Sequence, residues 1–127
     1  MDRPANKLFL ERISRHLKPG GKFVLETGVT AESLLPALQL RRWHRLGDIT
    51  VLSENRYETT ESELHTEYTF IRGALSESGT ATYSVYTVAE LKSLFTSCGF
   101  EVTALYGSKD RQPYGLGDRL FLTGKKR

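Results

Sequence analysis

The stretch HLKPGGKFVLETG, residues 16–28, decides how the chain begins to fold. Its first part ends a helix, because Pro19 cannot continue one and Gly20-Gly21 allow the chain to reverse. Its second part, Phe23-Val24-Leu25, is apolar without alternation, which is typical of a strand covered on both faces in a parallel sheet. The strand ends on Glu26-Thr27-Gly28, and sheets of this kind bind ligands beyond the carboxyl ends of their strands.

The segments on either side of this stretch predict helices. Over residues 7–17, apolar side chains recur at spacings of three and four, which marks one face of an amphipathic helix. After the strand, Thr30 offers an N-cap for a short helix through Leu38, with Pro36 either kinking that helix or opening it late.

The clearest local signal lies near the C-terminus. Thr87 and Glu90 form a capping box, in which each side chain bonds an end amide of the helix. Gly99 is placed to end this helix in a left-handed turn. The predicted buried stripe of the helix is Leu91, Leu94, Phe95 and Cys98. Two strands follow, FEVTALY at 100–106 and RLFLTGKK at 119–126, separated by a loop long enough to be functional.

The middle of the chain predicts an antiparallel meander. Three segments rich in strand-forming residues cover 48–58, 64–72 and 80–86, and polar breaks separate them at 59–63 and 73–79. A fourth strand is possible if RRWHR, residues 41–45, pairs across a turn at Gly47-Asp48.

Together the elements predict an α/β fold. The order helix, strand, helix, antiparallel insertion, helix, strand, strand is half of a doubly wound sheet. We expect a single domain over residues 1–127, with the antiparallel insertion at approximately 41–86, since 127 residues suffice for one core.

Composition excludes several classes of protein. No apolar run approaches the roughly 20 residues needed to span a bilayer, so no membrane association is expected. The single cysteine, Cys98, excludes an internal disulfide and favours a reducing, cytoplasmic setting, and we expect it to be a core residue. One cysteine and three scattered histidines have no metal-ligand spacing, so no metal site is expected.

The net charge of +3 is a weak signal. Part of it comes from the C-terminal GKKR, which is expected to be a frayed tail. Another part lies in LRRWHR at 40–45, a mixture of aromatic and basic residues that can mark a nucleic-acid surface. Elsewhere the aromatic residues do not alternate with basic ones. We therefore expect a half-buried Trp43 between solvated arginines, and nucleic acid is not the expected partner.

Two motifs carry a family resemblance. LKPGGKFVLETG at 17–28, followed by YTVAELKSLFTSCGFEVTALYGS at 86–108, resembles the C-terminal half of class I S-adenosylmethionine-dependent methyltransferases. In that family the first motif leads into the fifth strand of a Rossmann-like sheet, the second leads into the sixth, and an antiparallel seventh strand lies between them. The segment 42–72 is similar to an insertion that covers the substrate pocket in some members. The resemblance implies a small-molecule methyl acceptor.

The sequence departs from the family at the cofactor site. The family binds its cofactor on a glycine-rich turn after the first strand, where the backbone can approach the ligand closely. Here Gly20-Gly21 precedes a strand and Gly115-Leu116-Gly117 lies in a late loop, so neither has that context. The resemblance therefore implies S-adenosylmethionine as cofactor of the complete enzyme. For this chain alone we expect no cofactor-binding residues and no bound cofactor.

The resemblance also implies candidate site residues. Glu26 or Thr27 would face the methyl acceptor, and Glu26, His44 or His65 would serve as the base, although Glu26 could instead cap the next helix. The residues expected to bind substrate are Glu26, Thr27, Trp43, Arg56, Tyr83 and Tyr114. Of these, Trp43, Arg56 and Tyr83 are expected to share the exposed face of the meander near Glu26. Five aromatic residues either line a pocket or form the packing of the meander: Tyr57, Tyr68, Phe70, Tyr83 and Tyr86.

Two functional hypotheses follow. The chain is a fragment or truncated form of a small-molecule methyltransferase, inactive without an N-terminal half, or it is a non-catalytic dimerisation or ligand-binding domain with the same half-fold. In the family the strand at 23–26 has a neighbour on its other side that this sequence lacks. Its free edge and the apolar stripe of the helix at 7–17 would then favour a homodimer or a separate N-terminal half as partner.

Overall fold

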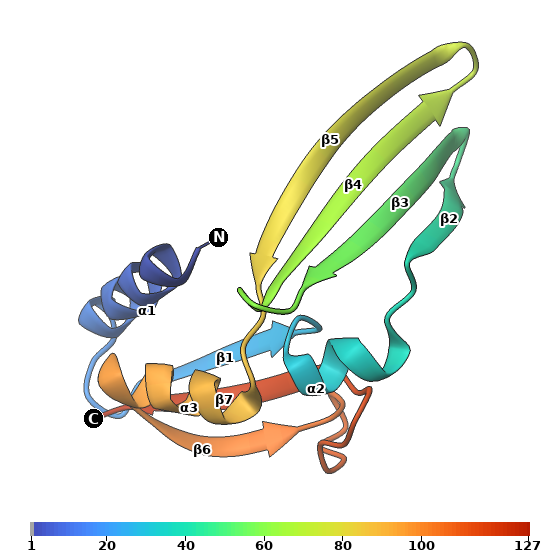
Figure 1. The fold of residues 1–127 in the computed structure, drawn as a ribbon. Coiled ribbons are helices and arrows are strands. Elements are labelled where there is room, and N and C mark those ends of the chain that lie inside the picture. The colour runs from blue at the N-terminus through green and yellow to red at the C-terminus, as the bar shows by residue number, and fades with distance from the viewer. Residues whose placement is uncertain (1) are drawn as a thin grey trace. The chain divides into compact units, whose positions relative to one another are not determined.

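The computed structural model describes residues 2–127, which form two compact units (Figure 1). The first unit combines the segment that ends at Ala37 with Val85–Arg127, and the second is Leu38–Ser84. The insertion predicted at about 41–86 falls on the second unit. Over the described residues, no helix is both long enough and apolar enough to cross a membrane.

The first unit is a three-stranded sheet with helices. Its helical elements are α1 (Arg3–His16), α2 (Ala31–Leu34), the 3₁₀ turn η1 (Leu35–Ala37) and α3 (Val88–Ser97). Its strands are β1 (Lys22–Thr27), β6 (Phe100–Tyr106) and β7 (Leu120–Lys126), in the order β1-β7-β6. Because β7 pairs antiparallel with both neighbours, the last strand of the chain lies between the two earlier ones, as predicted.

The core of this unit lies between the helices and one face of the sheet. Leu10 of α1 and Phe95 of α3 join one buried cluster with residues of β6 and β7. The cluster consists of Leu10, Leu91, Phe95, Cys98, Phe100, Leu120 and Leu122. Cys98 is therefore a core residue, as expected, and its thiol lies 3.7 Å from the Lys7 carbonyl oxygen.

The prediction that β1 is covered on both faces is wrong. Burial alternates along the strand: Phe23 and Leu25 pack against the core, whereas Val24 is 59% exposed. The reason is that α1 and α3 contribute to a core on one face only. The opposite edge of β1 pairs with no strand among residues 2–127.

Local capping signals place the helices correctly. Thr30 caps α2 by accepting from the Ser33 N–H, and Pro36 lies in the 3₁₀ turn that ends this segment. The capping box of Thr87 with Glu90 is present at α3, and Gly99 follows with φ of +93°. Helix α1 begins earlier than predicted, because Asp2 acts as its N-cap and accepts from the Ala5 N–H at 2.8 Å.

The C-terminal tail is ordered, contrary to expectation. The Lys126 ammonium donates to the Leu17 carbonyl oxygen at 2.7 Å. The Arg127 guanidinium donates to the carbonyl oxygens of Thr96, in the last turn of α3, and of Phe100. The basic tail is held because helix ends leave carbonyl groups without intrahelical partners.

The second unit is a four-stranded antiparallel meander. Its strands are β2 (Arg41–Leu46), β3 (Ile49–Glu58), β4 (Glu63–Arg72) and β5 (Leu75–Ser84), paired in chain order. The fourth strand that the sequence left open therefore forms, across the predicted turn at Gly47-Asp48. The predicted break at 73–79 is wrong in extent. Only Gly73 and Ala74 form the turn, since pairing with β4 extends β5 through the polar residues that follow.

Candidate functional site

The carboxyl end of β1 carries an exposed ion pair. Glu26 Oε1 accepts a hydrogen bond from Arg119 Nε at 3.0 Å, and both side chains are more than half exposed. Arg119 reaches this position because it precedes β7, whose first residue pairs with Thr27. A Cβ atom at Gly28 would lie 2.8 Å from Arg119 Nη1, so the missing side chain at this position makes room for the guanidinium.

Thr27 and Glu26 have separate local roles. The Thr27 hydroxyl accepts from the Val29 N–H at 3.1 Å, which stabilises the turn from β1 into α2. Because Thr30 caps α2, Glu26 is not the helix cap that the sequence allowed as an alternative. Glu26 instead holds Arg119, a residue that sequence reasoning missed.

Three hydroxyl groups meet beside this strand end. The Tyr114 hydroxyl lies 2.9 Å from Thr30 Oγ1 and 2.7 Å from Ser33 Oγ, and Thr30 donates to Ser33 at 2.8 Å. Thr30 and Ser33 are buried. The cluster ties the loop between β6 and β7, which carries Tyr114, to the first turn of α2.

Glu32 connects the same loop to α3. Its two carboxylate oxygens accept from the Val88 N–H at 3.1 and 3.3 Å, at the N-terminus of α3, where a negative charge is favourable. Its carbonyl oxygen accepts from the Gly117 N–H at 2.8 Å. An open hollow of about 330 Å³ lies here, lined by Glu32, Val88, Tyr114, Gly115 and Leu116. The first unit therefore places Glu26 and Thr27 at the carboxyl end of β1, and Tyr114 in the loop that precedes β7.

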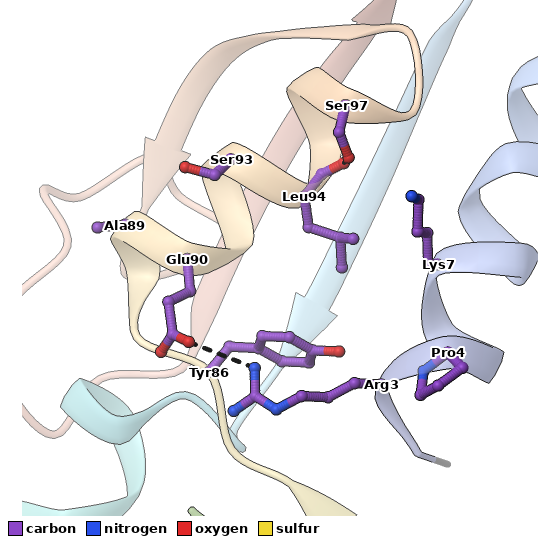
Figure 2. Close-up of a pocket in the computed structure, with 9 residues that line it drawn as sticks. All are labelled: Arg3, Pro4, Lys7, Tyr86, Ala89, Glu90, Ser93, Leu94 and Ser97. Carbon is purple, nitrogen blue, oxygen red and sulfur yellow. Dashed lines mark hydrogen bonds and ion pairs between the residues drawn. The ribbon is translucent and has the colours of Figure 1, made fainter.

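A second depression of the first unit lies between α1 and α3 (Figure 2). It measures about 840 Å³, and Arg3, Lys7 and Glu90 are among the residues that line it. The Arg3 guanidinium lies 4.3 Å from the centre of the Tyr86 ring, 3.3 Å from a Glu90 carboxylate oxygen and 3.0 Å from the Val85 carbonyl oxygen. Figure 2 shows the guanidinium beside the ring and directed toward Glu90. These contacts fasten the start of α1 to α3 and are structural.

The remaining substrate-binding candidates lie in the second unit and do not share one face. Cross-strand partners in a sheet point to the same side. Arg56 pairs with His65, on the face that Trp43 and its partner Leu52 also occupy. Tyr83 pairs with Leu64, whose partner on β3 is Tyr57, so Tyr83 points to the opposite face. The prediction that Trp43, Arg56 and Tyr83 share a face is therefore wrong, since side chains alternate along each strand.

Trp43 is 70% exposed, so its expected half-burial is also wrong. It lies on β2, an edge strand of the meander whose six residues are all exposed.

Four of the five aromatic candidates gather on one face of the meander, which we call the aromatic face. Tyr57, Tyr68, Phe70 and Tyr83 lie there, and Tyr86 belongs to the first unit. The Tyr68 and Phe70 rings stack with centres 6.1 Å apart. A hydrogen bond with Tyr68, together with partial burial, raises the pKa of the Tyr83 phenol above its ordinary value.

The candidate bases are distributed over both units. Glu26 belongs to the first, whereas His44 on β2 and His65 on β4 belong to the second. His65 Nδ1 lies 3.2 Å from the Thr82 hydroxyl and its Nε2 lies 3.8 Å from Glu63. Within residues 2–127, no three His, Cys, Asp or Glu side chains cluster closely enough to hold a metal ion.

No protein-family model matches the chain, and no curated protein sequence matches it. Solved structures of methyltransferases do. The CcbJ methyltransferase from Streptomyces caelestis matches with a TM-score of 0.73 and 13% identity, over 92% of this chain and 50% of its own. A sugar N-methyltransferase from Streptoalloteichus matches with a TM-score of 0.64 and 17% identity, over 99% of this chain and 50% of its own. An S-adenosylmethionine-bound amino pentose methyltransferase from Micromonospora echinaspora matches with a TM-score of 0.61 and 19% identity, over 99% of this chain and 53% of its own.

The chain thus spans about half the length of the methyltransferases that it matches. At these identities the similarity concerns the fold. The chain has the fold of the C-terminal half of a class I S-adenosylmethionine-dependent methyltransferase, with an antiparallel meander inserted, as the two sequence motifs predicted.

Proposed function

We propose that this chain is the acceptor-side half of an S-adenosylmethionine-dependent methyltransferase, and that methyl transfer requires a complementary half that supplies the cofactor site. The half-length match to methyltransferases supports this proposal, as does the bound cofactor in one of them. The sequence has no Gly-x-Gly turn between a strand and a helix, which is the arrangement that brings backbone amides close to a nucleotide-like ligand.

The observation that carries the proposal is the unfinished sheet of the first unit. One edge of β1 has no partner strand among residues 2–127. The sheet face opposite the core is open and forms a hollow of about 440 Å³. Residues lining that hollow include Lys22, Val24, Thr103, Tyr106, Phe121 and Thr123. A strand added at the β1 edge and helices laid on this face would complete a doubly wound sheet, in which both faces are covered.

The chain's own contribution to the reaction is to bind and orient the acceptor. S-adenosylmethionine supplies an electrophilic methyl group, and the protein has to align a nucleophile with it and, where needed, accept a proton. Glu26 is exposed at the carboxyl end of β1 and has a second carboxylate oxygen beyond the one that bonds Arg119. We assign Glu26 to hold the acceptor or its proton, Arg119 to orient Glu26, and Tyr114 to border the acceptor site.

The acceptor in this proposal is a small molecule that carries an amine. The sugar N-methyltransferase and the amino pentose methyltransferase with the same half-fold support this class. A protonated amine has no lone pair for the methyl group, so a proton acceptor close to the amine is needed. The one thiol, Cys98, is free and buried, which fits a reducing compartment such as the cytoplasm.

Calorimetry tests the division of labour between the halves. Titration of S-adenosylmethionine into the 127-residue chain should give no heat of specific binding, whereas the chain combined with a complementary half that carries a Gly-x-Gly turn should bind it. Micromolar affinity for the chain alone would overturn the proposal. In the combined enzyme, Glu26→Gln should lower kcat for an amine acceptor at an unchanged cofactor Kd, and an unchanged kcat would remove Glu26 from the reaction.

A further inference from the structure

The two faces of the meander differ sharply in charge. On the central strands β3 and β4, the aromatic face carries one charged residue, Arg72 at the end of β4. Its other members are Ile49, Val51, Ser53, Asn55, Tyr57, Leu64, Thr66, Tyr68 and Phe70. The opposite face of the same strands carries Glu54, Arg56, Glu58, Glu63 and Glu67. Antiparallel sheets with this division expose the charged face and cover the apolar one.

Part of the aromatic face is exposed apolar surface. At the end of the sheet formed by the turns at Gly47 and Gly73, Leu46 is 61% exposed, Phe70 44% and Leu75 73%. Contiguous apolar side chains of this size on a surface mark an interaction site. The one basic residue among them, Arg72, is already held by both carboxylate oxygens of Asp48, at 2.7 and 3.2 Å.

The two edges of this face carry opposite charge. Arg42 and His44 lie on β2, whereas Glu77 lies on β5. His44 and Glu77 stand in the same row across the sheet, through Val51 and Phe70. Within residues 2–127, none of Arg42, His44 and Glu77 forms an ion pair.

We infer that the aromatic face packs against the same face of a second copy of this chain, about a two-fold axis that runs along the strands. Rotation about such an axis places β2 of one copy opposite β5 of the other. Arg42 and His44 then face Glu77 of the second copy, and the pairing occurs twice because the interface is isologous. A two-fold axis across the strands would place β2 against β2 and bring like charges together, so the charges select the first arrangement.

The extent of the face limits the contact that a second copy could make. The ten residues of β3, β4 and β5 rise roughly 33 Å and the six of β2 roughly 20 Å, so at a strand spacing of about 4.8 Å the face measures roughly 570 Å². Val51, Leu64 and Thr66 on this face are already buried within the chain, so the contact with a second copy centres on the exposed end that carries Leu46, Phe70 and Leu75. Two such sheets packed face to face at about 10 Å form a sandwich whose inner faces are both apolar.

This inference does not rest on methyl transfer. It also moves the expected dimer contact from the β1 edge and α1 to the meander, and so leaves the unfinished sheet of the first unit free for a complementary half.

Light scattering on the full chain tests the inference. At micromolar concentration the molar mass should be about twice 14.4 kDa. Phe70→Glu should give a monomer, because it buries a carboxylate in the interface. The matched control is Leu52→Glu, which lies on the adjacent strand with 39% exposure but on the charged face, and it should remain a dimer. Leu75→Glu, at an exposed position near the turn, should also dissociate the dimer without affecting folding.

Charge reversal tests the axis. Glu77→Arg should weaken the dimer about tenfold or more by placing like charges together, and combining it with Arg42→Glu should restore the dimer. A monomeric wild-type chain, or a dimer that survives both Phe70→Glu and Leu75→Glu, would overturn the inference. A double variant no tighter than Glu77→Arg alone would overturn the axis along the strands.

Discussion

Two glycines show how the same substitution has different costs at different sites. At Gly28, an added methyl group would meet only the end of the Arg119 side chain, which can move aside. Gly28→Ala is therefore expected to change the free energy of unfolding by less than about 0.5 kcal/mol. It should nevertheless displace Arg119 from Glu26. A crystal structure of the variant tests this, and a guanidinium still bonded to Glu26 would contradict the prediction.

At Gly107 the neighbours cannot yield. A methyl group there would lie 2.8 Å from the Pro113 carbonyl oxygen and 2.7 Å from an Asp118 carboxylate oxygen. Gly107→Ala should cost about 1–3 kcal/mol, because relief requires the backbone of the loop to shift. Urea unfolding of the two glycine variants side by side measures the difference, and equal stabilities would contradict this account.

The hydroxyl cluster predicts a loss of stability when one member is removed. Tyr114→Phe leaves the buried hydroxyl groups of Thr30 and Ser33 without their shared partner, which should cost about 1–2 kcal/mol. Tyr106→Phe is the matched control, since that hydroxyl makes no hydrogen bond to the described residues. If both variants unfold at the same urea concentration as the wild type, the cluster does not hold the loop.

The roles of single residues were predicted correctly where their partners are close in the chain. Thr30, Thr87 and Glu90 act on amides three residues away, and their roles follow from spacing alone. Arg119 bonds Glu26, 93 residues away, and Arg127 bonds the Thr96 carbonyl, 31 residues away. No local sequence pattern predicts contacts over such separations. The prediction of a frayed tail failed for the same reason, because its partners are the end of α3 and the turn after α1.

The N-terminus of α3 should lose stability in acid. The Thr87 N–H donates to the Glu90 carboxylate, which lowers the pKa of Glu90, and the Arg3 guanidinium lowers it further. Since the folded pKa lies below the ordinary glutamate value, the stabilisation is present above about pH 4.5 and is lost as the pH falls through the folded pKa.

Replacing Glu90 by glutamine measures this contribution. Glu90→Gln keeps a hydrogen-bonding side chain but removes the charge, so the variant should be less stable than the wild type at pH 7. The difference should shrink as the pH falls through the folded pKa of Glu90. Denaturant unfolding across this range reports the difference. If the difference in free energy of unfolding between the two proteins does not narrow on acidification, the charge of Glu90 does not contribute to the cap.

The boundaries of helices were predicted well because capping residues define them. The extent and burial of strands were predicted less well, because they depend on pairing with other strands and on which neighbours are present. The apolar run in β1 predicted cover on both faces, yet Val24 is exposed because no described element lies over it. The segment 73–79 predicted a break, yet the ladder with β4 continues through residues 75–79. Alternation along each strand predicts that the meander has two faces. Which residues of different strands share a face depends on the pairing register, which the sequence does not give.

For the whole molecule, one-sided burial of β1 can be tested with neighbouring residues. Val24→Lys should leave the free energy of unfolding within about 0.5 kcal/mol of the wild type, because the side chain is exposed. Leu25→Lys should cost about 3 kcal/mol or more, since Leu25 packs against the core and the substitution would bury an unpaired charge. If both variants are equally destabilised in urea, the face that carries Val24 is covered in solution.

The same position distinguishes the complementary half from the second copy. A complementary half would pair with the free β1 edge and cover Val24, where a lysine would have to be buried without a partner. Val24→Lys should therefore abolish cofactor binding by the combined halves while the light-scattering dimer of the 127-residue chain persists. Phe70→Glu should do the reverse, abolishing the dimer and leaving assembly of the halves intact. Calorimetry and light scattering on both variants give four results, and a single variant that eliminates both associations would show that one surface serves both.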